Sequence, residues 1–199
     1  MTSTNVRERA HAGGAEGNAR LTGAAGAAIF VLLAIEGVTI LRVQRLLTAH
    51  VFIGMLLVPV VALKIGTTAY RFARYYRGAP DYSAKGPPPI VLRLAGPLVV
   101  ASTVAVFATG IAAIAVGPHS RWILEAHKAS FIVWFGMTTV HVLGHALETP
   151  ALAVADWRNQ HPKLGGTGIR RGLLLAALVA GIPLALLALG WIGAWRHAA

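Results

Sequence analysis

The sequence predicts an all-α integral membrane bundle of five transmembrane helices, with a cytoplasmic N-terminus and a C-terminus outside. Three observations predict this fold class. The chain of 199 residues is 56% hydrophobic and only 13% charged, with a mean hydropathy of +0.64. Five apolar runs each reach the roughly 20 residues that a helix needs to cross a bilayer. The basic residues are concentrated in alternate loops between these runs.

The composition excludes several classes of protein. About a quarter of the residues of a soluble globular domain are charged, and a disordered chain combines low hydrophobicity with high charge, so neither class fits. The chain has no cysteine, which excludes disulfide frameworks, thiolate metal sites and covalent haem attachment through a C-x-x-C-H motif. The eight histidines are therefore the main candidates for metal or cofactor chemistry.

The expected elements follow in chain order. Residues 1–20 are polar and of mixed charge, and we expect a flexible cytoplasmic tail there. Residues 21–199 are expected to form one membrane domain. The first apolar run is about 20 residues long and continues through Glu36, which favours a retained span over a cleaved signal peptide. The five spans are expected at about residues 21–41, 46–70, 94–117, 125–148 and 172–195.

The charge distribution predicts the orientation. The 18 Lys and Arg outnumber the 7 Asp and Glu, giving a net charge of +11. Such a charge is also typical of nucleic-acid-binding proteins, but no recognised nucleic-acid-binding motif accompanies it. Twelve of the 18 basic residues flank one side of the five runs, five flank the other, and Lys64 lies within a run. Because basic loops stay in the cytoplasm, this bias places the N-terminus inside, and anionic lipid is the expected partner of the inner loops.

Two histidines are expected at similar depth in the membrane. Spans two and four run in the same direction, from outside to inside, because one span separates them. His50 lies near the outer start of span two, and His127 lies near the outer start of span four. Two imidazoles that face each other across neighbouring helices can bind one haem iron from both sides. His50 and His127 are therefore the predicted axial ligands of an outer haem.

Span four carries a stripe of histidines. His127 and His141 are separated by about 21 Å along a helix and by only about 40° around its axis, and His145 follows one turn later. This spacing predicts a second haem toward the inner face that uses His141 or His145. On span two, however, the position 14 residues after His50 is Lys64.

Alternatives stay open for these inner residues. His141 and His145 share a helix face and can instead hold a divalent metal, with Glu148 as the nearby carboxylate, or can serve structural hydrogen bonding or a proton path. Lys64 can pair with a haem propionate or with Glu148, can act as a neutral axial ligand, or can extend its amine to the inner interface.

Charged residues near the outer histidines also have two interpretations each. Glu36 lies near the depth of His50, so it is expected either to hydrogen-bond that imidazole or to make a polar contact between helices. The basic residues at the outer span ends can neutralise haem propionates or anchor the helices at the interface. These basic residues are Arg42, Arg45, Arg121 and Lys128.

Several stretches together resemble one family. They are HVFIGMLL from His50, LKIGTTAYRFARYY from Leu63, GPPP from Gly86, HKASF from His127 and HVLGH from His141. In this order they resemble actinobacterial membrane cytochrome b-like proteins, which are similar to the haem-binding bundles that accompany oxidoreductases, including membrane anchors of molybdopterin-dependent ones. The resemblance covers roughly residues 20–195.

The resemblance implies a multi-pass helical bundle in the bacterial plasma membrane that carries haem b. It implies electron transfer between a quinone pool or soluble donor and a partner redox protein, as a subunit and not as a stand-alone enzyme. His50 and His127 match the ligand pattern of one haem, and His141 matches the second position on span four. Lys64 stands where a two-haem member has its fourth histidine, so one or two haems are expected. The competing expectation is a non-redox membrane protein that uses the histidines and Lys64 for metal or proton translocation, or as an assembly subunit.

Overall fold

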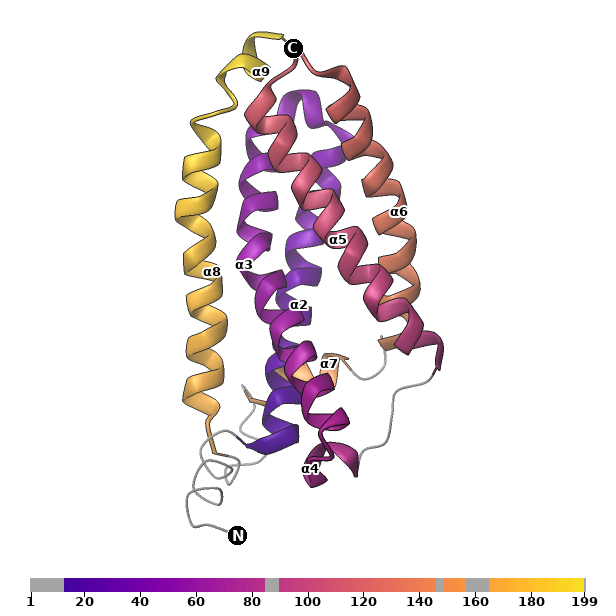
Figure 1. The fold of residues 1–199 in the computed structure, drawn as a ribbon. Coiled ribbons are helices and arrows are strands. Elements are labelled where there is room, and N and C mark those ends of the chain that lie inside the picture. The colour runs from indigo at the N-terminus through magenta and orange to yellow at the C-terminus, as the bar shows by residue number, and fades with distance from the viewer. Residues whose placement is uncertain (1–12, 85–89, 146–148, 157–164, 199) are drawn as a thin grey trace. The chain divides into compact units, whose positions relative to one another are not determined.

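The computed structural model describes residues 13–84, 90–145, 149–156 and 165–198, and within these ranges every regular element is a helix. The predicted all-α class is therefore confirmed for the described part of the chain. Figure 1 shows five long helices and three short ones. The long helices are α2 (Gly14–Leu41), α3 (Val43–Tyr76), α5 (Ile90–Val116), α6 (Arg121–His145) and α8 (Thr167–Leu189), and the short ones are α4 (Pro80–Ser83), α7 (Thr149–Ala155) and α9 (Gly193–Ala198).

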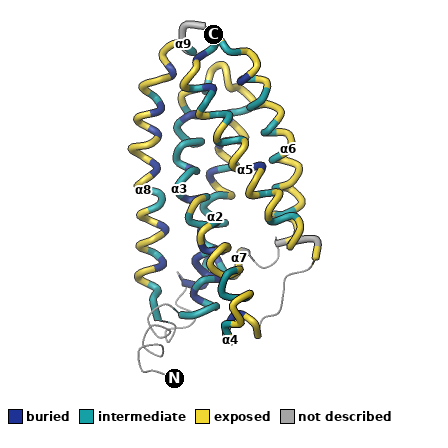
Figure 2. The backbone as a smooth tube through the Cα atoms, viewed as in Figure 1, coloured by how far each residue is buried: buried dark blue, intermediate teal, exposed yellow. Residues whose placement is uncertain are grey.

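Four of the long helices, α2, α3, α5 and α8, are long and apolar enough to cross a membrane. Their outer surfaces are apolar as well, and Figure 2 shows long exposed stretches on these helices. Phe30, Leu41 and Leu187, for example, expose 62%, 83% and 68% of their surface. Large exposed apolar surfaces are unfavourable in water, whereas a bilayer accommodates them and helices satisfy their backbone groups internally. These four helices indicate a membrane protein.

The predicted fourth span corresponds to α6, which does not belong to that group of four. It is helical over 25 residues. Its residues include three charged side chains and two histidines before its last turn, and these lower its apolar character. They are Arg121, Glu125, His127, Lys128 and His141. Residues 146–148, the end of the predicted span, lie outside the described ranges. The fifth crossing and the sides of the two termini stay predictions.

The helices do not begin and end where the predicted spans do, and the bounds of the spans stay predictions. The first helix begins at Gly14, so residues 14–20 are helical. The second extends to Tyr76 instead of ending near residue 70. The last long helix covers Thr167–Leu189, and the chain turns before α9, so residues 190–195 are not part of it. Hydropathy marks only the apolar part of a helix, whereas hydrogen bonding continues into polar turns.

The chain divides into two compact units, each built from three segments. The first unit contains residues 1–32, 59–87 and 147–180. Its close packing depends on small residues: Gly23 of α2 is buried, and a Cβ there would lie 2.7 Å from the Cβ of Leu152 in α7. Asn18 Nδ2 of α2 donates a hydrogen bond to the Thr67 carbonyl of α3 at 3.1 Å. This unit therefore joins the first half of α2 to α3 and α7.

The second unit contains residues 33–58, 88–146 and 181–199. Its apolar core includes Val51 of α3, Ala188 of α8 and the fully buried Ile192. Helices α5 and α6 pair across their length, where Trp134 Nε1 donates to Thr103 Oγ1 at 3.0 Å. This unit holds together the outer ends of the predicted spans and both predicted outer haem ligands.

Candidate functional site

His50 and His127 lie together in the second unit, as the sequence predicts. His50 is in α3, one turn after the non-helical residue Leu46, and His127 is in the second turn of α6. Their ring centroids are 6.4 Å apart, and the ring planes meet at 70°. Both imidazoles are half-buried. Two residues that are 77 positions apart in the sequence therefore form one pair of rings.

The His50 ring is held by an acidic partner. Glu36 of α2 is buried with 8% of its surface exposed, and its Oε1 lies 3.0 Å from His50 Nδ1. Thr39 Oγ1 lies 3.2 Å from the same ring nitrogen and donates to Glu36 within the same helix. Glu36 therefore lies at ion-pair distance from His50 and makes a polar contact between helices α2 and α3, so the contact agrees with both predicted roles of Glu36.

The His127 ring is held by neutral partners. Its Nδ1 lies 3.1 Å from the Val106 carbonyl oxygen and 3.2 Å from Thr109 Oγ1, both in α5. Because a carbonyl can only accept, Nδ1 must carry the proton of this hydrogen bond. Thr109 Oγ1 also lies 3.0 Å from Ser130 Oγ, one turn further along α6. Sequence reasoning did not predict Val106 or Thr109 as partners of His127.

Both rings are fixed through the same atom. Within the described part of the chain, the hydrogen bonds of the two rings and the ion-pair contact of His50 with Glu36 are all made at Nδ1. A neutral imidazole whose Nδ1 donates has a lone pair on Nε2, and this is how protein histidines are prepared to bind metals. The described residues contain no group of three or more His, Cys, Asp or Glu that could hold a bare metal ion. The chemistry of this site is therefore that of a two-histidine site.

The predicted inner residues are only partly described. Lys64 of α3 belongs to the first unit, where its Nζ donates to the Thr22 carbonyl oxygen at 3.3 Å. His141 belongs to the second unit and is half-buried, so the roles of Lys64 and His141 at an inner haem stay predictions. The side chain of His145 and all of Glu148 lie outside the described residues, as do the metal and ion-pair alternatives that involve them.

The predicted outer basic residues differ in their contacts. Lys128 Nζ pairs with Glu125 Oε1 at 2.9 Å on the exposed face of α6. Arg42, Arg45 and Arg121 are exposed. Their interpretation as propionate partners or as interfacial anchors stays open.

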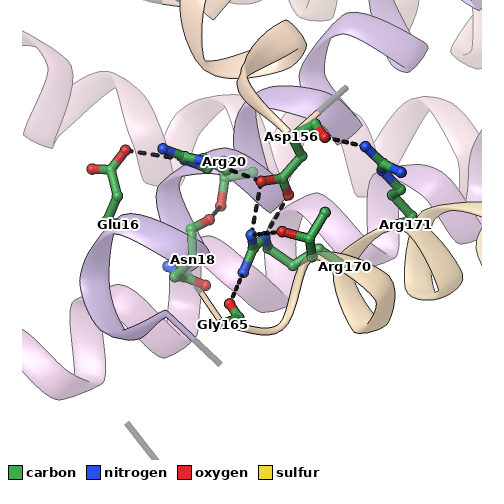
Figure 3. Close-up of polar contacts among 9 residues, drawn as sticks. Glu16, Asn18, Arg20, Asp156, Gly165, Arg170 and Arg171 are labelled. Carbon is green, nitrogen blue, oxygen red and sulfur yellow. Dashed lines mark hydrogen bonds and ion pairs between the residues drawn. The ribbon is translucent and has the colours of Figure 1, made fainter. Parts of the chain in front are cut away.

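Sequence reasoning missed one buried ionic cluster, which Figure 3 shows. Asp156, at the end of α7, accepts hydrogen bonds from Arg170 Nη2 at 2.7 Å and from Arg20 Nη1 at 3.2 Å. Arg20 and Arg170 expose only 3% and 5% of their surface. In the sequence, these two arginines contribute only to the excess of basic residues that predicts the orientation. A signal was available, because Asp156 is the only acidic residue after position 148.

The electrostatics of this cluster are dominated by the arginines. Burial by itself raises the pKa of the Asp156 carboxyl, but the hydrogen bonds from Arg170 and Arg20 outweigh it and hold the pKa below its usual value. Arg171 also donates to the Asp156 backbone carbonyl. Asp156 thus accepts from three arginines and joins the start of α2 to the start of α8. We assign this cluster a structural role.

Comparisons with protein-family models, with curated proteins and with solved structures found no match.

Proposed function

We propose that this protein is a membrane b-type cytochrome that transfers electrons between a quinone pool or donor and a partner oxidoreductase. The observation that carries the proposal is the His50–His127 pair, with both rings fixed through Nδ1. Haem b is held only by axial ligands and packing, so it needs no cysteine. This agrees with a chain that has eight histidines and no cysteine.

The separation of the two rings fits an iron between them. With metal–nitrogen bonds of about 2 Å and ring centres about 1 Å further out, imidazoles on opposite sides of one metal have centroids about 6 Å apart. The observed separation is 6.4 Å. His50 and His127 would hold the iron through Nε2, and haem would supply one-electron redox chemistry. The surrounding residues Glu36, Thr39, Val106 and Thr109 orient the two rings.

The proposal includes the five-span topology with the N-terminus inside, in a bacterial plasma membrane. In this topology the His50–His127 site lies toward the outer face, at the same end as the exposed Arg42 and Arg45. A second haem would use His141 or His145 near the inner face, with Lys64 as a propionate partner. The sequence has neither G-x-G-x-x-G nor G-x-x-x-x-G-K-[ST], so a partner protein is expected to hold the other redox centre.

An absorbance measurement tests the proposal directly. The protein is purified in detergent after expression with ample haem, and spectra are recorded oxidised and after dithionite reduction. We expect a Soret band and the α and β bands of a reduced b-type haem. Pyridine haemochrome per protein gives the stoichiometry. Absence of a Soret band would reject the proposal and favour the non-redox alternative, in which the histidines and Lys64 serve metal or proton translocation or assembly.

Single histidine substitutions test the assignment of the ligands. His50→Ala and His127→Ala are each expected to remove the outer haem, since each leaves the iron with one imidazole. His119→Ala is the matched control, because His119 is exposed in the loop between α5 and α6 and should leave the haem content unchanged. Full haem content in either ligand variant would show that the assigned pair is wrong.

A further inference from the structure

The two imidazoles of the site have chemically different partners. His50 Nδ1 lies 3.0 Å from a carboxylate oxygen of Glu36, whereas His127 Nδ1 faces the carbonyl oxygen of Val106 at 3.1 Å. The hydroxyl of Thr109, at 3.2 Å from His127 Nδ1, is also neutral. A carboxyl group therefore lies behind one ring, and neutral groups lie behind the other.

The position of Glu36 is costly unless it serves the site. A buried carboxylate loses its hydration and is stable only when it is paired and hydrogen-bonded. Glu36 is the only acidic residue between positions 17 and 80, and it lies in a helix that is long and apolar enough to cross a membrane. Its partners within the described residues are His50 and Thr39. An apolar residue would suit the helix better, so the carboxylate serves the His50 ring.

The surroundings keep this carboxylate in place. Thr39 Oγ1 lies 2.7 Å from the Glu36 carbonyl and 3.1 Å from Glu36 Oε2, so one hydroxyl braces both the backbone and the side chain. Gly54 lies one turn after His50 in α3, and a Cβ there would approach Glu36 Oε1 to 3.4 Å. The Glu36 carboxylate thus lies against α3 at Gly54, within ordinary van der Waals contact of a Cβ at that position.

We infer that Glu36 is a positioning residue that makes His50 the more strongly electron-donating imidazole and lowers the reduction potential of an iron bound by the pair. This inference rests on the proposed haem site. A carboxylate that accepts the Nδ1 proton raises the basicity of the ring as a ligand. A nearby negative charge also favours the oxidised, more positive iron over the reduced iron. Val106 and Thr109 supply neither effect to His127.

A redox titration of the purified holoprotein tests the inference. One electron passes from a redox mediator to the iron, and no bond forms or breaks. In Glu36→Gln the amide oxygen can still accept from Nδ1, but the charge is lost. We expect the variant to retain haem. We also expect its ratio of reduced to oxidised iron at a given potential to be about tenfold that of the unmodified protein, which raises the midpoint potential of a one-electron couple by about 59 mV. The electron paramagnetic resonance spectrum of the oxidised iron should change with it.

Matched variants separate the carboxylate from a general change in charge. Glu125→Gln removes the same charge from an exposed carboxylate that pairs with Lys128, and it should leave the midpoint potential near that of the unmodified protein because water screens it. Thr109→Ala removes a neutral partner of His127 and should shift the potential less than Glu36→Gln. Glu36→Asp keeps the charge, so its midpoint potential should stay near that of the unmodified protein. This variant also provides a test if Glu36→Gln does not accumulate.

The outcomes distinguish the inference from the function on which it rests. Haem in the unmodified protein, together with an unchanged potential in Glu36→Gln, would overturn the inference and leave the proposed function standing. Equal shifts in Glu36→Gln and Glu125→Gln would also overturn it. If Glu36→Gln cannot be purified, Glu36→Asp decides. A rise of about 59 mV in the midpoint potential of Glu36→Asp would also overturn the inference. A protein without haem would reject the proposed function itself.

Discussion

The His127 imidazole has little room to move. Its Nδ1 is hydrogen-bonded to α5 through the Val106 carbonyl, and Gly110 of the same helix lies against the Cε1–Nδ1 side of the ring. A Cβ at Gly110 would lie 3.0 Å from His127 Cε1 and 3.3 Å from its Nδ1. These distances are tighter than ordinary van der Waals contact. The ring could yield only by weakening its hydrogen bond to Val106.

Gly110→Ala is therefore expected to displace the His127 ring. We expect a lowered haem content or an altered Soret band, because a displaced ring distorts a metal–nitrogen bond of about 2 Å. Gly136→Ala is the control, since a Cβ at Gly136 meets nothing within 4 Å. Both changes replace a helical glycine by alanine and raise helix propensity by about 1 kcal/mol. Identical spectra of the two variants would contradict the expected displacement.

The sequence predicted a contact between residues where the depth of each residue in the membrane could be counted along its helix. Glu36 and His50 are expected at similar depth because each is a short distance from the same turn between two helices, and they lie at ion-pair distance. The partners of His127 could not be found this way. Val106 contributes a backbone carbonyl, which any residue type possesses, and only the rotation and packing of α5 against α6 bring it to the ring.

Among the helices of the first unit, Asp156 links the end of α7 to α8 and to α2. The carboxylate receives hydrogen bonds from Arg170 at the start of α8 and from Arg20 near the start of α2 (Figure 3). All three side chains are buried. Removing one partner from a buried ion pair leaves the other charge uncompensated. The cluster is therefore essential for the stability of the first unit.

Asp156→Asn is expected to destabilise the protein by about 3–5 kcal/mol, the usual cost of breaking a buried ion pair from one side. Thermal unfolding in detergent at neutral pH measures the effect. Asp81→Asn is the control, because Asp81 is an exposed aspartate in α4 of the same unit. A loss of stability no larger than that of Asp81→Asn would show that the cluster contributes little.

The stabilities of the unmodified protein and of Asp156→Asn should also respond differently to acid. The folded pKa of Asp156 lies below its usual value, and the unfolded value is about 3.9. Its stabilisation is therefore fully present above pH 4 and is lost as the pH falls through the lowered folded pKa. The Asp156→Asn variant lacks this contribution at every pH, so its stability should decline less steeply than that of the unmodified protein below pH 4. A parallel decline would contradict the assignment.

At the scale of the whole molecule, the fifth crossing decides the topology. Four helices have the length and apolar character for a span, whereas α6 carries His127 and has more polar residues. If α6 crosses, the loop before it and the start of α8 lie on opposite sides of the membrane. If it does not cross, they lie on the same side.

The absence of cysteine makes this question accessible. His119→Cys, in the exposed loop before α6, should react with a membrane-impermeant thiol reagent on intact cells. Gly168→Cys, near the start of α8, should be protected until the cells are opened. Both positions are exposed, and a Cβ at Gly168 meets nothing within 4 Å. Labelling of Gly168→Cys on intact cells would show that α6 does not cross.

The sequence by itself determined the helical class, the apolar helices and the residues in which to look for a site. These properties follow from composition and from runs of side chains, which are local in the chain. Only the tertiary structure decided which partners surround the histidines and which arginines are buried against Asp156. Backbone carbonyls have no sequence signature, and ion pairs such as Arg20–Asp156 join residues 136 positions apart. Their formation depends on how helices rotate and pack, because burial makes an unpaired polar group costly.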